Sequence, residues 1–209
     1  MKLIRFGEAG RERPGVLLDD GSRLDVSDFV SDYDEAFFAR GGMDALRDWL
    51  KTHFSPASRV PSTVRTWPDT SCTNDYSERS FQLERGGQWV KGKSADTFAP
   101  LGPFLASPDE FPDPSNLKMW LKVNGEIRQN SSTANMIFDV ATLLSYVSEF
   151  MTLLPGDVIS TGTPAGVGLG MKPPQYLKSG DVVELGIDGL GESRQRVVNF
   201  SEQRYSQTV

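Results

Sequence analysis

Residues 73–102 read TNDYSERSFQLERGGQWVKGKSADTFAPLG, and no other stretch of the sequence is as informative. The stretch carries a carboxylate (Asp75), an amide (Gln82) and three cations (Arg79, Lys91 and Lys93). Its apolar residues follow neither the 3.6-residue period of a helix nor the alternation of a strand, as those of a core element would. We therefore predict a segment whose polar side chains surround a small anionic ligand.

The bulk composition is that of a globular protein. Its 209 residues suit one medium domain, or an ordinary domain with a small one. The formal charge of −6 argues against a broad nucleic-acid-binding face. No apolar run is long enough to cross a bilayer, and the amino terminus lacks the apolar centre of a signal peptide. Cys72 is the only cysteine and cannot form an internal disulfide, so we expect a cytoplasmic protein. From the charge and the lack of a long apolar run, we expect neither nucleic-acid nor membrane partners.

The only histidine, His53, excludes two common kinds of site. One chain cannot build a multi-histidine zinc centre from it. The sequence also lacks the G-x-S-x-G turn that carries the nucleophile of many Ser-His-Asp hydrolases. We interpret His53 as a surface residue at the end of a helix, where a cation suits the helix dipole.

The chain is predicted to have two folded parts. Residues 1–60 form a small α/β module, with a strand at 2–6, a hairpin around an Asp-Gly turn at 16–26, and helices at 32–40 and 43–54. Residues 61–72 belong to a stretch rich in Pro, Ser and Thr and are predicted to be a linker. Residues 73–209 form the larger domain.

Short strands and few helices are predicted in the larger domain. The Asn124-Gly125 turn predicts a hairpin, because both positions of a type I′ turn need positive φ. A helix is predicted at 139–151, with an apolar stripe that we interpret as core. Further strands are predicted at 158–161, 182–187 and 195–200. These patterns together indicate a β-rich α+β fold.

A glycine-rich loop spans residues 162–170. It is neither a Walker loop nor a dinucleotide fingerprint, because the glycine spacing and the following Met-Lys-Pro-Pro run suit neither. Two interpretations remain: backbone N–H groups that cradle an anion, or an ordinary turn-rich loop. Asp75 and Lys93 also have two interpretations each. Asp75 is either a functional carboxylate or a turn residue, and Lys93 is either a ligand-binding cation or a solvated lysine, as most lysines are.

A series of short motifs runs in order along the larger domain: Asn74-Asp75-x-Ser77-x-Arg79, Gln82, Lys91-Gly92-Lys93-Ser94, Pro100-Leu101-Gly102-Pro103, Val123-Asn124-Gly125, Gln129, Leu154-Pro155-Gly156-Asp157 and Thr161-Gly162-Thr163-Pro164. The series resembles the C-terminal domain of the fumarylacetoacetate hydrolase family. The bacterial two-domain hydrolases and lyases, such as those called ureidoglycolate lyase or diketo-sugar-acid hydrolase, are the most similar subgroup, and residues 1–60 resemble their amino-terminal domain. The resemblance implies a mixed β-sheet roll with few helices and a small covering module.

The resemblance also implies roles for individual residues. Asp75 would be a metal ligand, Gln82 and Lys93 would contact the substrate or a metal-bound water, and Gly162 and Thr163 would bind a substrate oxygen. The family implies Mg²⁺ or Mn²⁺ as cofactor, a small keto acid as substrate and a homodimer as the assembly.

The sequence departs from the family pattern in one place. A Glu-x-Glu strand, which supplies two further metal carboxylates, and an upstream histidine motif should precede Asn74, and neither occurs in this chain. We attribute both losses to an internal deletion at residues 61–72, either a biological one or one introduced by an exon or reading-frame error in the gene model. With one carboxylate left, a strongly hydrated Mg²⁺ should bind poorly, unless Asp69 or Glu78 replaces a ligand.

Two functions follow from this pattern. The chain is either a metal-dependent hydrolase or lyase of small keto acids, or a non-catalytic binding or assembly protein that pairs with an intact paralogue. Retention of Asp75, Gln82 and Lys93 favours the first, and loss of the Glu-x-Glu and histidine motifs favours the second.

Overall fold

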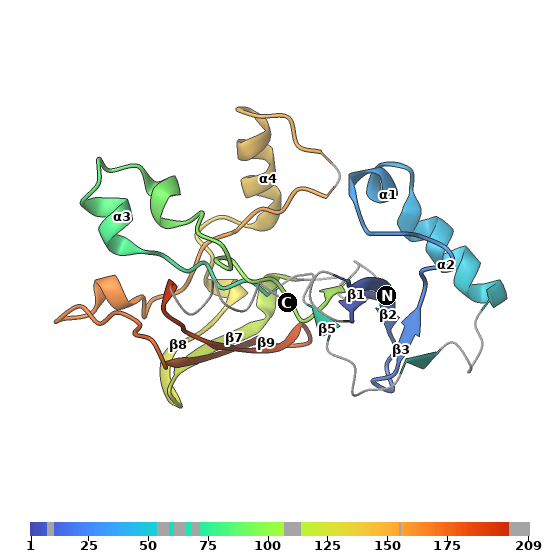
Figure 1. The fold of residues 1–209 in the computed structure, drawn as a ribbon. Coiled ribbons are helices and arrows are strands. Elements are labelled where there is room, and N and C mark those ends of the chain that lie inside the picture. The colour runs from blue at the N-terminus through green and yellow to red at the C-terminus, as the bar shows by residue number, and fades with distance from the viewer. Residues whose placement is uncertain are drawn as a thin grey trace. The chain divides into compact units, whose positions relative to one another are not determined.

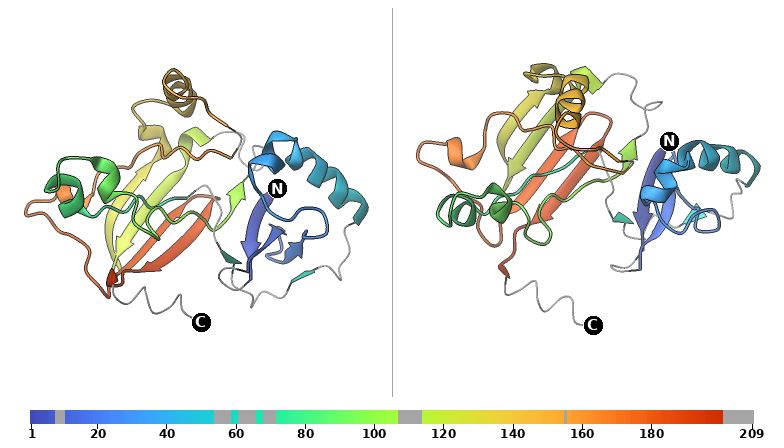
Figure 2. Two further views of the ribbon diagram at one scale, coloured as in Figure 1. Left: turned by 45° about the horizontal axis from the view of Figure 1, so that its top comes forward. Right: turned by 90° about the horizontal axis from the view of Figure 1, so that it is seen from above.

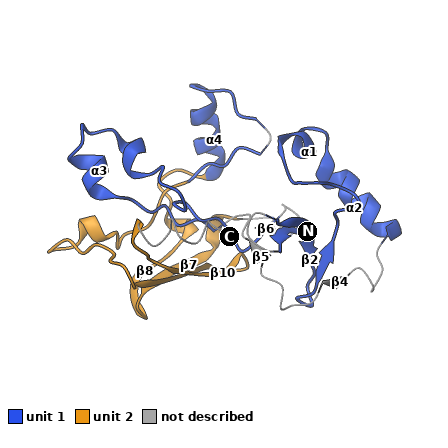
Figure 3. Cartoon of the chain, in the orientation of Figure 1, with its two compact units in different colours: residues 1–112, 140–160 blue, residues 113–139, 161–209 orange. Residues whose placement is uncertain are grey.

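The computed structural model describes residues 1–7, 11–53, 59–60, 66–67, 72–106, 114–154 and 156–200. It divides into two units, residues 1–112 with 140–160, and residues 113–139 with 161–209 (Figure 3). The predicted linker at 61–72 lies mostly outside the described residues, and the predicted boundaries at 60 and 73 stay predictions. Among the described helices, none is long and apolar enough to span a membrane.

The amino-terminal module contains an antiparallel sheet (Figure 1). Its strands are β1 (Lys2–Phe6), β2 (Arg13–Leu17), β3 (Arg23–Asp25), β4 (Arg59–Val60), β5 (Thr66–Trp67) and β6 (Leu105–Ala106). The order is β4-β3-β2-β1-β5, and β6 also pairs with β1. The first strand and the hairpin predicted from the Asp-Gly turn are therefore confirmed.

Two helices follow, α1 (Glu35–Ala39) and α2 (Gly42–His53). Helix α1 begins three residues later than predicted because Asp34 is its N-cap, and the Asp34 carboxylate accepts a 2.8 Å hydrogen bond from the Phe37 amide. His53 ends α2 as an exposed residue that stacks on Trp49, in agreement with its interpretation as a surface residue.

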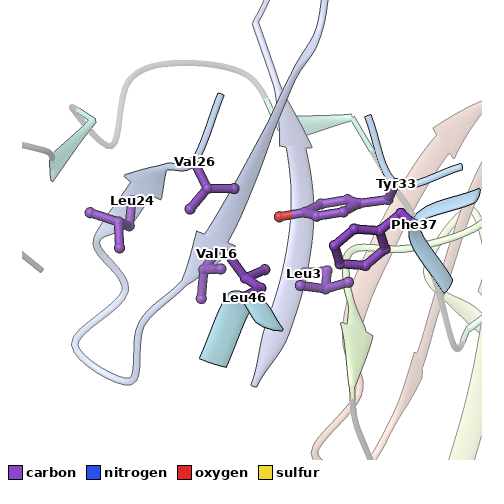
Figure 4. Packing of buried hydrophobic residues seen from close by; sticks show 7 residues of the cluster. All are labelled: Leu3, Val16, Leu24, Val26, Tyr33, Phe37 and Leu46. Atoms are coloured by element: carbon purple, nitrogen blue, oxygen red, sulfur yellow. The ribbon is translucent and has the colours of Figure 1, made fainter. Parts of the chain in front are cut away.

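The core of the module lies between the sheet and the helices. Its buried members are Leu3, Val16, Leu24, Val26, Tyr33, Phe37 and Leu46 (Figure 4). The Tyr33 hydroxyl donates a 2.7 Å hydrogen bond to the Gly15 carbonyl, so its polar atom is satisfied within the apolar cluster. The residues that alternate inward on the strands and one face of α2 build this core, as the sequence pattern indicates.

The second unit contains a four-stranded antiparallel sheet, seen from two sides in Figure 2. Its strands are β7 (Lys118–Val123), β8 (Glu126–Ser132), β9 (Val182–Ile187) and β10 (Gly191–Arg196), in the order β10-β9-β7-β8. Asn124 and Gly125 have φ values of 52° and 83°, so the predicted hairpin turn is confirmed. The sheets and the few short helices make the fold α+β and β-rich, as predicted.

Three predicted features of the larger domain are wrong. Residues 158–161 form no strand, because no described strand pairs with them. The last strand occupies 191–196 rather than 195–200, because the turn after β9 is short. Helix α4 (Val140–Ser148) is present, but its apolar stripe is not core, since none of its residues is buried.

A hydrogen-bond network joins the β7–β8 turn to the start of β9. Asn124 Nδ2 donates to Asp181 Oδ1 at 2.9 Å, and Asn124 Oδ1 accepts from the Val182 amide at 2.9 Å. The Lys178 amide donates to the second Asp181 oxygen at 2.8 Å. The bonds from Asn124 and from the Lys178 amide lower the pKa of Asp181 below its usual 3.8.

Replacing Asp181 with asparagine is expected to lower the free energy of unfolding by about 1 kcal/mol at pH 6. The folded state favours the carboxylate, so its contribution is present above the ordinary pKa and is lost as the pH falls below 3.8. Urea unfolding of both proteins at pH 6 and pH 3 should show the difference shrinking at the lower pH. An equal difference at both values would contradict the role of the Asp181 charge.

Candidate functional site

Asp75 and Lys93 form an ion pair in the first unit. Lys93 Nζ lies 2.5 Å from Asp75 Oδ2. The Lys93 side chain is 24% exposed and the Asp75 side chain is 45% exposed. The segment is held locally by a bridge between Thr73 and Leu101 and by a hydrogen bond from the Asn74 amide to the Pro100 carbonyl. Asp75 and Lys93 are eighteen positions apart in the sequence, and the fold brings their side chains into contact. A segment that surrounds a ligand requires such contacts.

Gln82 lies on the short helix α3 (Arg79–Leu83) and is fully buried, with 0% exposure. Its Oε1 accepts a 2.5 Å hydrogen bond from Arg79 Nη1. This bond orients the amide, so that Nε2 is the atom left to donate, and Nε2 has no partner among the described residues. A buried donor without a partner costs stability, and a ligand oxygen could remove that cost.

Close packing holds α3 against the 3₁₀ helix η2 (Trp89–Gly92). A Cβ atom on Gly92 would lie 2.6 Å from the Glu78 carbonyl oxygen and 2.7 Å from Gln82 Cβ, so only glycine fits there. The Glu78 amide donates a 2.9 Å hydrogen bond to the Gly92 carbonyl across the same contact. The Lys91-Gly92-Lys93 motif thus places η2 against Gln82 directly before Lys93.

Two further polar residues in this segment have no role in the sequence analysis. Thr73 Oγ1 and Ser77 Oγ are buried without a hydrogen-bond partner in the described part of the chain. Tyr76 lies between them in sequence, and burial raises the pKa of its hydroxyl to about 12, against the opposite effect of a hydrogen bond with Asn74. Burial likewise raises the pKa of the Cys72 thiol to about 11. In the sequence, Ser77 was marked only by its position in the Asn-Asp-x-Ser motif. Thr73 lies outside the motif and had no such signal.

Gly162 and Thr163 lie in the second unit and are exposed. Gly162 has a φ of +104°, which favours glycine. Gln129 Nε2 on β8 donates to Thr163 Oγ1 at 2.8 Å and to the Pro164 carbonyl at 2.9 Å. The loop also passes close to β8, since a Cβ atom on Gly166 would lie 1.9 Å from the Arg128 carbonyl oxygen. Gln129 was a motif position without a role, and the structure shows that it holds this loop.

The described residues do not fit a chelated divalent cation. No group of three Asp, Glu, His or Cys side chains in the described ranges is placed to hold a metal ion. The Asp75 carboxylate faces the Lys93 ammonium, and Glu78 is occupied as the N-cap of α3, accepting from Ser80. Asp69, the other possible substitute ligand, lies outside the described residues. One carboxylate paired with a lysine is a poor competitor for the hydration shell of Mg²⁺.

Comparison with known proteins gives a consistent result. A family model for the fumarylacetoacetate (FAA) hydrolase C-terminal domain matches residues 70–198. A Burkholderia orbicola protein, named provisionally as a hydrolase, is 58% identical over 280 aligned positions, which cover 95% of this chain and 99% of the relative.

Solved structures show the same fold. Fumarylacetoacetate hydrolase from Exiguobacterium antarcticum is 29% identical, has a TM-score of 0.76, and matches 95% of this chain and 99% of its own. Maleylpyruvate hydrolase from Sphingobium sp. SYK-6, solved with manganese(II) and pyruvate, shares the fold at 21% identity and a TM-score of 0.69, with coverage of 95% and 99%.

Proposed function

Because the chain belongs to the fumarylacetoacetate hydrolase family, we propose that it binds a small keto acid through the Asp75–Lys93 segment without metal-dependent turnover. The solved relatives include hydrolases and an isomerase, and one of them was solved with manganese(II) and pyruvate. The observation that carries the proposal is the ion pair between Asp75 and Lys93, in a sequence that contains no Glu-x-Glu.

Donors in the segment suit a keto acid. The Lys93 ammonium supplies a positive charge for the substrate carboxylate. Gln82 Nε2 is an oriented, buried donor without a partner in the described part, and it suits a carbonyl oxygen. The assignment of a substrate oxygen to Gly162 and Thr163, which the family resemblance implies, is kept as a separate proposal, because these residues lie in the second unit.

The Asp75 carboxylate has an unusual consequence in this proposal. It competes with the substrate for Lys93, because both are anions that seek the same ammonium. Replacing Asp75 with asparagine is therefore expected to strengthen pyruvate binding by a factor of about 1.4 to 5, the fold-change that corresponds to the roughly 0.2–1 kcal/mol of a partly exposed ion pair. Lys93→Ala should abolish the binding.

Calorimetric titration with pyruvate, and separately with Mn²⁺, tests these expectations. Lys91→Ala is the matched control, since Lys91 Nζ donates to the Arg85 carbonyl and is an exposed lysine of the same motif. We expect no Mn²⁺ binding in the micromolar range. Micromolar Mn²⁺ affinity that Asp75→Asn removes, together with weaker pyruvate binding in that variant, would overturn the proposal.

The second candidate is an active metal-dependent hydrolase or lyase of keto acids. The relative solved with manganese(II) and pyruvate favours it, together with the retained Asp75, Gln82 and Lys93. Cleavage or hydrolysis of a panel of keto acids in the presence of Mn²⁺ or Mg²⁺, lost in Asp75→Asn, would support this candidate over binding alone.

The assembly and the compartment are part of the same proposal. We propose a cytoplasmic homodimer, or a dimer with an intact paralogue, that meets only small-molecule ligands and neither nucleic acid nor membrane. Sedimentation of the purified chain tests the homodimer. Co-purification of a second family member from its host tests the paralogue.

A further inference from the structure

Gln129 is a motif position that has no role in the proposed function. It lies on β8, the strand at one end of the second sheet, and the glycine-rich loop, orange in Figure 1, passes beside it. Its Nε2 lies within hydrogen-bond distance of two acceptors, Thr163 Oγ1 at 2.8 Å and the Pro164 carbonyl at 2.9 Å. All three residues belong to the second unit, so the contact is internal to that unit.

The two acceptors fix the orientation of the Gln129 amide. A carbonyl oxygen accepts hydrogen bonds and never donates them, so the Gln129 atom beside the Pro164 carbonyl is the nitrogen. The amide nitrogen carries two hydrogens, and the second is donated to Thr163 Oγ1. In this contact the Thr163 hydroxyl is therefore an acceptor.

The contact leaves the hydrogen of the Thr163 hydroxyl to be donated elsewhere. A hydroxyl has one hydrogen to donate, and no acceptor for it is present in the part of the chain that the structure describes. Thr163 is exposed, so a ligand can reach this hydrogen. The bond from Gln129 also strengthens the hydroxyl as a donor, because hydrogen bonds in series polarise one another. Thr163 thus offers an oriented donor to a ligand oxygen.

A β-bulge on β8 brings a second side chain to the same loop. The register between β7 and β8 shifts at residues 121–122, which leaves Arg128 as an extra residue on β8. Neighbouring side chains on a regular strand point to opposite faces, and a bulge changes these directions. Arg128 Nη1 donates to Gln175 Oε1 at 2.7 Å. The strand therefore holds the loop at two points, Thr163 through Gln129 and Gln175 through Arg128.

We propose that Gln129 is a positioning residue: by donating to Thr163, it directs the Thr163 hydroxyl as a donor to an oxygen of the bound keto acid. The ligand atom that Thr163 meets is then an acceptor, a carboxylate or keto oxygen. For the ligand, this inference rests on the proposed function and on its assignment of a substrate oxygen to Thr163. The hydrogen bond between Gln129 and Thr163 depends on neither.

Calorimetric titration of the full chain with pyruvate measures the effect of the donor. Thr163→Val removes the hydroxyl at nearly constant volume and should weaken binding about tenfold, as expected for a lost hydrogen bond to a charged acceptor. Thr163→Ser keeps the hydroxyl and should stay within about twofold of the unmodified chain. Gln129→Met removes the donor amide and should weaken binding about fivefold. Gln129→Glu should weaken it at least as much, because a carboxylate accepts the Thr163 hydrogen and reverses the bond.

A double-mutant cycle separates positioning from general support of the loop. If Gln129 acts through Thr163, Gln129→Met should change pyruvate affinity by less than about twofold in a Thr163→Val background, because no hydroxyl is left to direct. Gln175→Ala is the matched control, since it removes the other side-chain anchor of the loop without removing a charge. It should leave pyruvate affinity nearly unchanged. Equal losses from Gln129→Met in both backgrounds, or an equal loss in Gln175→Ala, would overturn the inference in favour of a structural role.

A measurement without ligand tests the contact separately. Three-bond NMR couplings of the Thr163 γ-methyl carbon report the χ1 rotamer of this residue. We expect a single rotamer in the unmodified chain and in Gln175→Ala, and averaging between rotamers in Gln129→Met. Averaging in the unmodified chain, or a single rotamer that Gln129→Met leaves unchanged, would overturn the inference.

The outcomes distinguish failure of this inference from failure of the proposed function. If the unmodified chain binds pyruvate and Thr163→Val binds it equally well, the inference is wrong and the role of Lys93 is untouched. If the unmodified chain does not bind pyruvate, the proposed function fails and the role of Thr163 as a donor to the keto acid fails with it. The couplings then still decide whether Gln129 fixes the Thr163 side chain.

Discussion

Replacing Leu46 with alanine is expected to lower the free energy of unfolding of the amino-terminal module by about 3 kcal/mol. Leu46 is fully buried on α2 and packs in the cluster that includes Leu3 and Val16. The loss combines the transfer of the removed methyl groups with the cavity that the substitution leaves. Folded domains typically have a total stability of about 5–15 kcal/mol, so the effect is a sizeable share of it.

Urea unfolding followed by tryptophan fluorescence measures this effect, because Trp49 lies on the same helix and packs on Phe29. Leu144→Ala is the matched control, with the same change on the exposed helix α4, and should cost about 0.5 kcal/mol or less. Equal costs for the two substitutions would contradict the observed difference in burial between α2 and α4.

Replacing Gly92 with alanine is expected to weaken pyruvate binding at least about tenfold and to destabilise its segment by about 2–3 kcal/mol. The new Cβ would lie 2.6 Å from the Glu78 carbonyl oxygen and 2.7 Å from Gln82 Cβ. Both atoms belong to the start and body of α3, so the helix must move away from η2. Gln82 and Lys93, which flank the contact, would then lose their positions.

Calorimetric titration with pyruvate and thermal unfolding together test the Gly92 substitution. Val90→Ala lies on the same 3₁₀ helix but concerns an exposed side chain, so it should leave both measurements nearly unchanged. Unchanged pyruvate affinity in Gly92→Ala would show that the α3–η2 contact does not position the ligand-binding residues. Loss of binding without loss of stability would locate the effect in Gln82 and Lys93 alone.

Local chemistry explains the features that the sequence predicted correctly. Asn124 and Gly125 predict their hairpin because positive φ values are a property of these two residues themselves. The Asp-Gly turn and the spacing on α2 predict the amino-terminal module for the same reason. The ordered motifs from Asn74 to Pro164 predict the family. Each motif reflects a local backbone or side-chain requirement, so it can be recognised from its own residues.

Features that depend on distant partners were not predictable in this way. The predicted strand at 158–161 is absent and the α4 stripe is exposed, because a strand needs a neighbour and an apolar face needs a cover. The residues of the segment itself show neither the neighbouring strand nor the covering element. Burial of Thr73 Oγ1 and Ser77 Oγ, and the hold of Gln129 on Thr163, likewise depend on chain that lies elsewhere in the sequence.

By itself, the sequence determined the family, the β-rich α+β class, the two main turns and the candidate residues Asp75, Gln82, Lys93, Gly162 and Thr163. Only the tertiary structure decided that Asp75 pairs with Lys93 and that the described residues leave α4 exposed. The physical reason is the separation along the sequence between the residues that interact. Turns and motifs depend on neighbouring residues, whereas ion pairs and burial depend on which distant parts of the chain are present to meet.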